Sequence, residues 1–349
     1  MPHGVFAANT LAAEVGSRAV ATMTDKRPVA LATAPLRGPG VDTLASVCEL
    51  VEDPWIDHVP LRIWDGRKLA ERVGETGAKI LIVESDFVMG EEIMDAGLIA
   101  IGSCRGDPNN VDVAAATERG IPVLHAPGRN ADGVAELAVA LTLAAGRHVI
   151  PADADLRASR VFRDDTIPYQ RYRGWQIAGR TIGLVGLGAV GKAAAWRFEG
   201  LGMRVISHDP YNDLATHPSL EGLLGEADVV SMHAPPVPET LGMMGARQFA
   251  GMRDGAIYVN TARAALHDLD ALTDALASDK LSAAALDHFE GEQLPVGHPL
   301  AEMPNVVLTP HIGGATYDTE SNHTSMLAED IRRLLGGERP LHCVNPEVL

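Results

Sequence analysis

The chain has few cysteines, few aromatic residues and no excess of positive charge. Three cysteines, Cys48, Cys104 and Cys343, are spread over 349 residues. They form no CxxC pair, so the sequence predicts neither a disulfide framework nor a metal site. Free thiols favour a reducing compartment, and we expect a cytoplasmic protein. The formal net charge of −17 excludes a uniformly basic surface for nucleic acid or for an anionic membrane.

Long apolar runs are also missing. The best candidate for a membrane span, ELAVALTLAAG, is interrupted by Glu136 and is too short to cross a bilayer. The N-terminus has no cationic stretch followed by an apolar block, so no signal peptide is predicted. Residues 1–27 carry no clear strand or helix pattern and are expected to form a loosely held extension.

Short apolar runs of the length of strands alternate with helical stretches along the rest of the chain. Strands separated by helices form parallel βαβ units, so the sequence predicts an α/β protein with two doubly wound parallel sheets. The expected strands of the first half are PVALATA, LRIW, KILIVES, LIAIGS and IPVLHA. Those of the second half are TIGLV, RVISHD, ADVVSMHA, AIYVNTA, SAAALDHF and NVVLTPH.

Three further segments connect or follow these units. A long apolar helix is expected through Ala145, with Asn130 or Asp132 as its N-cap. Residues 150–180 are polar and rich in arginine and aspartate, and an irregular arm is expected there. The tail TYDTESNHTSMLAEDIRRLLGG has the spacing of one amphipathic helix, which we expect to return to the first domain.

The segment TIGLVGLGAVG carries the most informative motif of the chain. Gly186, Gly188 and Gly191 form a GxGxxG pattern between a strand and a helix, and an acidic residue, Asp209, follows about twenty residues later. The glycines permit a tight turn, close approach of a pyrophosphate and close helix packing, while the helix N-terminus binds phosphate. The carboxylate of Asp209 would bind the ribose hydroxyls and repel a 2′-phosphate, which favours NAD over NADP.

Three polar residues follow strands of the second half at the edge where parallel sheets bind ligands. Arg263 follows IYVNTA, Glu292 follows AALDHFEG and His311 follows NVVLTP. A guanidinium can bind and polarise a 2-oxo carboxylate, an imidazole can accept the hydroxyl proton, and a carboxylate can orient that imidazole. The trio therefore predicts a dehydrogenase that acts on a hydroxy acid.

These motifs resemble the D-isomer-specific 2-hydroxyacid dehydrogenase family, near its phosphoglycerate dehydrogenase and hydroxyacid reductase branches. The matching segments include LVGLGAVGKAAAWRFEGLGMRVISHDPY, VVSMHAPPVPET, IYVNTAR, AAALDHFEGE and VVLTPHIGGAT. The resemblance implies a flavodoxin-like substrate domain, residues 28–126 plus 312–349. It also implies an inserted Rossmann NAD-binding domain, residues 127–311, that forms a homodimer.

The same resemblance assigns roles to individual residues. The catalytic arginine, glutamate and histidine correspond to Arg263, Glu292 and His311. The implied cofactor-binding residues are Gly186, Gly188, Ala189, Val190, Gly191, Asp209, His233, Ala234, Pro235, Thr261, Asp287 and Gly313.

The first half departs from the phosphoglycerate-type pattern. Those members carry an arginine and a serine where this chain reads Glu84-Ser85-Asp86, and the following glycine loop here contains Arg105. We expect Arg105 to supply the missing positive charge for a polar or sugar-derived hydroxy acid, although an ion pair of Arg105 with Glu84 or Asp107 fits the sequence equally well. The expected substrate-binding residues are Ser85, Arg105, Gly106, Asp107, Arg263 and His311.

Two other functions fit the same fold. A formate- or phosphite-type dehydrogenase is one, but formate-type members carry glutamine in place of Glu292. An NAD-sensing corepressor that uses the fold as a binding module is the other, and turnover of any hydroxy acid would exclude a purely regulatory role.

Overall fold

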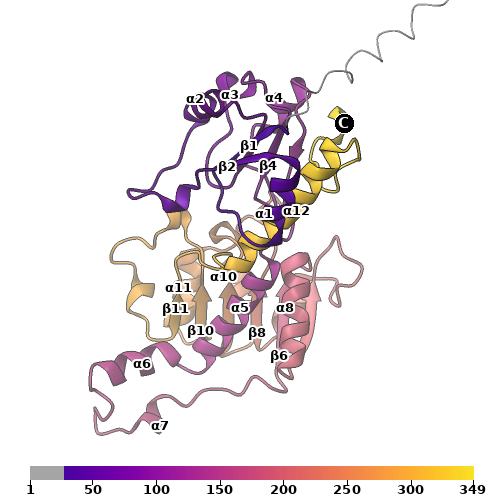
Figure 1. The fold of residues 1–349 in the computed structure, drawn as a ribbon. Coiled ribbons are helices and arrows are strands. Elements are labelled where there is room, and N and C mark those ends of the chain that lie inside the picture. Colours follow the sequence, from indigo (N-terminus) through magenta and orange to yellow (C-terminus); the bar gives the residue numbers. More distant parts are fainter. Residues whose placement is uncertain (1–26) are drawn as a thin grey trace, which may run out of the picture. The chain divides into compact units, whose positions relative to one another are not determined.

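The computed structural model describes residues 27–349, which divide into two compact units (Figure 1). Unit 1 comprises the chain up to Ala126 together with Thr324–Leu349, and unit 2 comprises Pro127–His323. The break after Ala126 lies where the strand pattern of the first half ends. The second break lies inside the last long helix rather than at His311. Apart from residue 27, the N-terminal extension is outside the described residues.

Unit 1 contains a five-stranded sheet in which all neighbouring strands are parallel. The strand order is β2-β1-β3-β4-β5, the doubly wound order of flavodoxin-like folds. The strands are β1 (Val29–Ala32), β2 (Glu49–Glu52), β3 (Ile80–Val83), β4 (Ala100–Ser103) and β5 (Val123–Leu124).

Helices cover both faces of this sheet, which explains why its central strands are apolar at consecutive positions. Leu81 and Ile101 pack in one core cluster, whereas Ile80 and Ile82 point to the other face. Ile331 of helix α12 (Tyr317–Leu335) packs in that second cluster, so the tail helix covers the first sheet. The remaining elements of unit 1 are α1 (Pro39–Val47), η1 (Trp55–Asp57), α2 (Gly66–Thr76), α3 (Glu91–Met94), α4 (Val113–Glu118) and η5 (Pro346–Val348).

One expected strand of unit 1 is wrong. The segment LRIW, residues 61–64, has no strand structure, and Glu49–Glu52 forms the edge strand instead. Side chains rather than a neighbouring strand hold residues 61–64. The backbone N–H of Trp64 donates to the Asp86 carboxylate at 2.6 Å, and Arg62 bonds to Asp53 at 2.6 Å.

Unit 2 contains a six-stranded parallel sheet with the order β11-β10-β9-β8-β6-β7. The chain reverses its direction of winding at β6, which has β7 on one side and β8 on the other. In open parallel sheets, ligands bind beyond the carboxyl ends of the strands at this switch point. The strands are β6 (Thr181–Val185), β7 (Arg204–His208), β8 (Val229–Met232), β9 (Ala256–Asn260), β10 (Leu281–Leu286) and β11 (Val306–Leu308).

The second sheet is also buried on both faces. Val230 and Tyr258 belong to one core cluster, and Val229 and Ile257 belong to the other. The long apolar helix α5 (Ala131–Gly146) begins after Asn130 and packs against α8 and the sheet. The other elements are α8 (Ala189–Gly200), α9 (Leu220–Glu226), α10 (Ala246–Gly251), η2 (Ala264–Leu266), α11 (Leu269–Ala277), η3 (Glu290–Glu292) and η4 (Pro299–Glu302).

The polar arm after α5 contains two short helices, α6 (Val149–Arg157) and α7 (Pro168–Arg171), where an irregular segment was expected. The carboxylate of Asp155, 4% exposed, organises the arm by accepting from Tyr172 at 2.5 Å and from Arg163 at 2.9 Å. Among the described residues, no single helix has the length and apolar composition of a membrane span. The helices α5 and α6 reach that composition only as a pair, bent by 66°.

Candidate active site

The glycine turn after β6 is shaped by close backbone contacts. A Cβ on Gly186 would lie 2.6 Å from the backbone nitrogen of Ala234, and Gly186 has a φ of 97°. A Cβ on Gly191 would lie 2.2 Å from the carbonyl oxygen of Gly186. Neither position tolerates a side chain without a backbone shift. These two glycines therefore bring the first turn of α8 against the end of β6.

Gly188 differs from its two neighbours in the motif. It is exposed and caps the N-terminus of α8, and a Cβ there would meet no described atom within 4 Å. The protein itself does not require glycine at this position, whereas a phosphate seated on the helix N-terminus would. Ala189 and Val190 form the first turn of α8 at the same place.

Asp209, at the end of β7, faces the glycine turn. Its two carboxylate oxygens accept the backbone N–H groups of Leu187 and Tyr211, at 2.8 and 2.9 Å. Each carboxylate oxygen has a second lone pair, so Asp209 can still accept hydrogen bonds from the hydroxyls of a ribose. The geometry of Gly188 and Asp209 fits an adenine dinucleotide.

Unpaired polar atoms lie at the carboxyl ends of the neighbouring strands. The Thr261 hydroxyl, after β9, and Nδ1 of His233, after β8, are buried and have no hydrogen-bond partner among the described residues. Buried polar atoms without partners are uncommon in folded proteins and can mark a ligand site. Burial lowers the pKa of His233 to about 4, so its ring is neutral at neutral pH. Ala234 and Pro235 follow His233 in the loop after β8.

His311 and Glu292 are in direct contact. Nδ1 of His311 is 3.0 Å from both carboxylate oxygens of Glu292. Both residues have left-handed backbone conformations, with φ of 54° and 59°. The bond assigns the ring proton to Nδ1 and leaves the Nε2 lone pair available to accept another proton. This is the geometry that a general base requires.

The loop that carries His311 is held by Asp287, which is 1% exposed. One oxygen of Asp287 accepts the backbone N–H of Ile312 at 2.9 Å, and the other accepts that of Gly313 at 2.8 Å. The Thr309 hydroxyl also donates to the Asp287 carboxylate, at 2.6 Å. A Cβ on Gly313 would lie 3.0 Å from the same carboxylate. Asp287 and Gly313, both expected to bind the cofactor, here fix the loop that carries His311.

His288 is a residue of the site that the sequence analysis did not select. Its ring centroid is 4.1 Å from that of His311, and its Nε2 is 3.7 Å from a Glu292 oxygen. The pKa of His288 is lowered, chiefly by burial and then by the nearby charges of His311 and Arg263. His288 and Glu292 lie four residues apart just after β10, and this spacing is the sequence signal that could have identified His288.

Arg263 caps the short helix η2 and is exposed. Its guanidinium donates to the carbonyl oxygen of Ala262 at 2.7 Å. The side-chain amide of Asn260 donates to the carbonyl oxygen of Arg263 at 2.9 Å. Its charge acts on His288, which packs against His311. The three predicted residues therefore belong to one neighbourhood at the carboxyl ends of β9, β10 and β11.

The substrate residues predicted in the first half lie in unit 1, where hydrogen bonds to neighbouring residues hold three of them. Nε of Arg105 donates to the carbonyl oxygen of Glu84 at 2.7 Å, and its NH1 donates to Asn109 at 2.6 Å. The Ser85 hydroxyl donates to the Glu84 carboxylate at 2.6 Å, and the Gly106 carbonyl accepts from His125 at 2.7 Å. Asp107 is exposed in the same loop.

Comparison with known proteins identifies the family of this fold. Residues 139–313 match the family model described as D-isomer specific 2-hydroxyacid dehydrogenase, NAD binding domain. The glyoxylate reductase of Thermofilum pendens is 33% identical over 335 residues, which cover 93% of this chain and 96% of that protein. The D-3-phosphoglycerate dehydrogenase of Mycobacterium leprae is 37% identical over 312 residues, 87% of this chain but 56% of that protein.

Solved structures show the same fold over both units. The D-lactate dehydrogenase of Lactobacillus jensenii, determined with NAD⁺, has a TM-score of 0.74 and 26% identity and covers 91% of this chain and 99% of its own. The TT0316 protein of Thermus thermophilus has a TM-score of 0.76 and 37% identity, with 90% and 99% covered.

The fold and the site define an NAD-dependent oxidoreductase that acts on the CH–OH group of its donor. The chain belongs to the D-isomer-specific 2-hydroxyacid dehydrogenase family. It spans about half the length of the phosphoglycerate dehydrogenases that it matches, 51% for that of Archaeoglobus fulgidus and 56% for that of M. leprae.

Proposed function

We propose that this chain interconverts a small D-2-hydroxy acid and the corresponding 2-oxo acid, with Arg263, Glu292 and His311 as its catalytic residues. The contact of His311 with Glu292, at 3.0 Å in the unit that also holds the dinucleotide fingerprint, carries the proposal. It supports His311 as the group that accepts the hydroxyl proton of a substrate bound next to the nicotinamide.

The chemistry divides between the cofactor and the protein. Bound NAD supplies the hydride acceptor for oxidation, and NADH supplies the donor for reduction. Arg263 binds the substrate carboxylate and polarises the C2 oxygen, because a guanidinium stays charged and can grip a carboxylate with two hydrogen bonds. Nε2 of His311 takes the hydroxyl proton as hydride leaves C2, and returns it in the reverse direction. Glu292 holds the Nδ1 proton and stabilises the imidazolium that forms.

The cofactor would be held by the glycine turn before α8 and by polar groups at the carboxyl ends of the strands. Gly188 and the first turn of α8 would bind the pyrophosphate, Asp209 the adenosine ribose, and Thr261 the nicotinamide half. The open position of Gly188 and the unpaired hydroxyl of Thr261 support this assignment.

The substrate proposed here is polar and sugar-derived. Unit 1 offers Arg105 as a cation in the loop after β4, whereas the segment after β3 offers Glu84 and Asp86. A guanidinium in this loop suits a hydroxylated or anionic end of the acid.

A panel of 2-oxo acids, followed by NADH absorbance, tests the proposal. The panel includes glyoxylate, pyruvate, phosphorylated 2-oxo acids and 2-oxo sugar acids, and formate and phosphite are assayed with NAD. We expect the highest kcat/KM for a 2-oxo acid with polar substituents. Oxidation of formate or phosphite alone, or no turnover at all, would exclude the proposed reaction.

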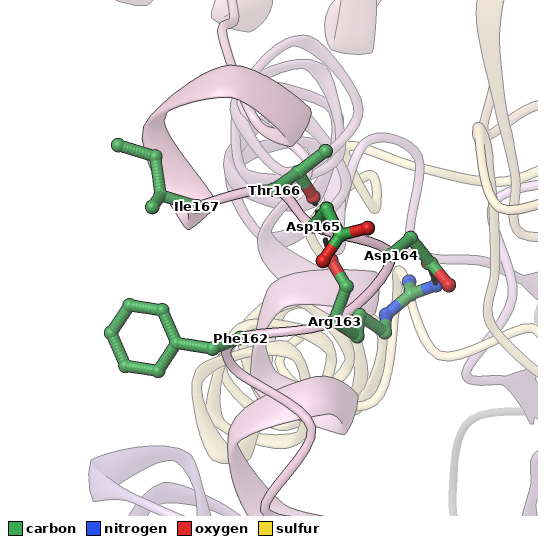
Figure 2. A pocket seen from close by; sticks show the side chains of 6 residues that line it. All are labelled: Phe162, Arg163, Asp164, Asp165, Thr166 and Ile167. Carbon is green, nitrogen blue, oxygen red and sulfur yellow. Dashed lines mark hydrogen bonds and ion pairs between the residues drawn. The ribbon is translucent and has the colours of Figure 1, made fainter.

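We infer that unit 2 also forms a homodimer, through the arm of residues 149–172. Phe162 and Tyr169 are each 79% exposed and Leu156 is 66% exposed, an unusual concentration of large apolar groups for a free surface. Figure 2 shows that Phe162 and Ile167 point to the same side, away from Arg163 and Asp164. These residues line a pocket of about 350 Å³. A second copy of the chain would cover this apolar side.

Sedimentation of two matched variants tests the homodimer. Phe162→Asp places a charge on the apolar side of the arm and should shift the protein from dimer to monomer. Leu214→Asp places the same charge on another exposed apolar residue of unit 2, 72% exposed and outside the arm, and should leave the dimer intact. A monomeric wild-type protein, or a dimer that persists in Phe162→Asp, would contradict the inference.

A further inference from the structure

The cluster around His311 contains one more metal-ligating side chain than the proposed reaction uses. Proton transfer requires His311 and Glu292, whereas His288 has no part in it. The nearest ligand atoms of His288, Glu292 and His311 all lie within 4.8 Å of one another. Two imidazoles and one carboxylate are a ligand set that zinc accepts, with its fourth position open to water or substrate.

The spacing of these atoms is close to that of a zinc site. In a tetrahedron with bonds of about 2.0–2.1 Å, neighbouring ligand atoms are about 3.3 Å apart. Nδ1 of His311 is 3.0 Å from the nearest Glu292 oxygen, and Nε2 of His288 is 3.7 Å from the same atom. Movements of a few tenths of an ångström would bring these two edges to that spacing, and the ligand atoms of the two histidines lie within 4.8 Å of each other. The exposed Glu292 side chain can supply these movements.

We propose that His288, Glu292 and His311 form a zinc-binding site that inhibits the enzyme by occupying the base. The metal would be held by Nε2 of His288, one carboxylate oxygen of Glu292 and Nδ1 of His311.

The inhibition follows from the tautomer of His311, and this step rests on the proposed function. Without metal, Nδ1 keeps its proton and donates a hydrogen bond to Glu292. The Nε2 lone pair is then available to the substrate. Zinc takes the lone pair of Nδ1, so the Nδ1 proton passes to solvent and Nε2 takes a proton from solvent. The ring stays neutral overall, but Nε2 now carries a proton and cannot accept one from a hydroxyl group.

The surroundings make this site weaker than a structural zinc centre. The charge of Arg263 acts on His288 and opposes a divalent cation, while Asp287 and Glu292 favour one. Nδ1 of His288 is buried without a partner among the described residues, so the acceptor that usually orients a zinc-bound histidine is missing for that ring. Zinc should therefore bind reversibly and be removed by a chelator.

Metal binding is measured first without any assay of turnover. The full chain, freed of metal by EDTA and dialysis, is titrated with CoCl₂ and then with ZnCl₂. We expect one ion per chain, visible d–d absorption typical of tetrahedral cobalt, and loss of that absorption when zinc displaces cobalt. His288→Asn should weaken binding roughly tenfold or more, since loss of a direct ligand exceeds loss of an outer partner.

A matched histidine serves as the control. His217 pairs with Glu226 at 2.9 Å elsewhere in unit 2, where Arg204 rather than a second histidine completes the cluster. His217→Gln should bind cobalt like the wild-type chain. Equal affinity in His288→Asn and His217→Gln, or no tetrahedral cobalt spectrum, overturns the metal site whatever the enzyme turns over.

Inhibition is then tested with the best substrate of the panel. Zinc should lower kcat, EDTA should restore it, and His288→Asn should need about ten times more zinc for the same inhibition. Zinc that binds at this site and leaves kcat unchanged would overturn the inhibitory role, whereas His311→Asn tests the assignment of His311 as the base without zinc.

Discussion

The two units contain parallel sheets of the same winding but use the ends of their strands differently. In unit 1, the loops after β3 and β4 bind each other. Asn110 donates to the carbonyl oxygens of Glu84 and Asp86, at 3.3 and 2.9 Å, and Arg105 donates to Glu84. In unit 2, the corresponding ends carry the open Gly188, the unpaired Thr261 hydroxyl and the His311–Glu292 pair.

This difference separates the scaffold from the chemistry. A doubly wound sheet requires only apolar strands and covering helices, and both units meet that requirement. The loops after β3 and β4 of unit 1 are tied to each other by hydrogen bonds, although Thr33 Oγ1 and Asp86 Oδ2 are buried without a partner among the described residues. The loops of unit 2 leave groups that a dinucleotide and a substrate would satisfy. If this difference holds, activity, acid stability and substrate affinity divide between the two units.

The largest effect is expected for His311→Asn in unit 2. Asparagine can keep a hydrogen bond to Glu292 but cannot act as a base at neutral pH. General acid–base catalysis contributes about 10²- to 10⁴-fold, so kcat should fall by that factor. Steady-state assays measure the loss, and calorimetric titration with NADH should show unchanged binding.

The control for this variant is again His217→Gln, which alters the other histidine–glutamate pair of unit 2. Its kcat should match that of the wild-type chain. If His311→Asn retained near wild-type kcat, the proton would have to be transferred by another group, and the proposed mechanism would fail.

Mild acid should weaken unit 2 more than unit 1. Burial lowers the pKa of His267 to about 4, and Asn260 donates to its Nδ1 at 2.9 Å, so the fold holds this ring neutral. Its contribution is fully present above about pH 6.5, the unfolded value, and is lost as the pH falls towards 4. This loss is at most about 3 kcal/mol.

Unit 1 has the opposite case in Asp86, whose pKa is raised by burial. A carboxyl group that the fold prefers neutral is destabilising when ionised, and acid relieves that cost as the pH falls through the raised pKa. Hydrogen exchange at pH 7 and pH 4.5, corrected for intrinsic rates, can follow β3 and β9 separately. Protection should fall in β9 and hold in β3.

The variant His267→Gln sharpens this test, because glutamine has no proton to gain. Its acid sensitivity should be reduced but not abolished, since burial also lowers the pKa of His233 to about 4. Equal loss of protection in β3 and β9 would show that buried histidines do not set the acid stability of unit 2.

Most of the fold could be predicted from the sequence because it depends on local patterns. Continuous apolar runs such as ILIV and TIGLV mark strands buried on both faces, and glycines with defined spacing mark the turn into α8. The prediction of a strand at LRIW failed because residues distant in sequence hold this segment. The carboxylate of Asp86, for example, accepts the backbone N–H of Trp64, and the local sequence carries no sign of that bond.

The site was predicted less completely, for a similar reason. Position after a strand was enough to select Arg263, Glu292 and His311. The packing of His288 on His311 depends on how two separate loops fold, and the clamp of Asp287 on Gly313 depends on contacts between residues 26 apart. Spacing along the chain does not show which polar atoms remain unpaired after folding.

The smallest effect, and the one that tests unit 1, is expected for Arg105→Ala. If the guanidinium binds a polar end of the substrate, KM should rise about tenfold, equivalent to about 1.4 kcal/mol, with little change in kcat. Arg105→Lys should recover part of the affinity because it keeps the charge. Asn109→Ala distinguishes the effect of the Arg105 charge from the effect of the hydrogen bonds that hold the loop, since it removes a partner of Arg105 but not the guanidinium. An equal rise of KM in Arg105→Ala and Asn109→Ala would show that the braced shape of the loop, rather than its charge, determines substrate affinity.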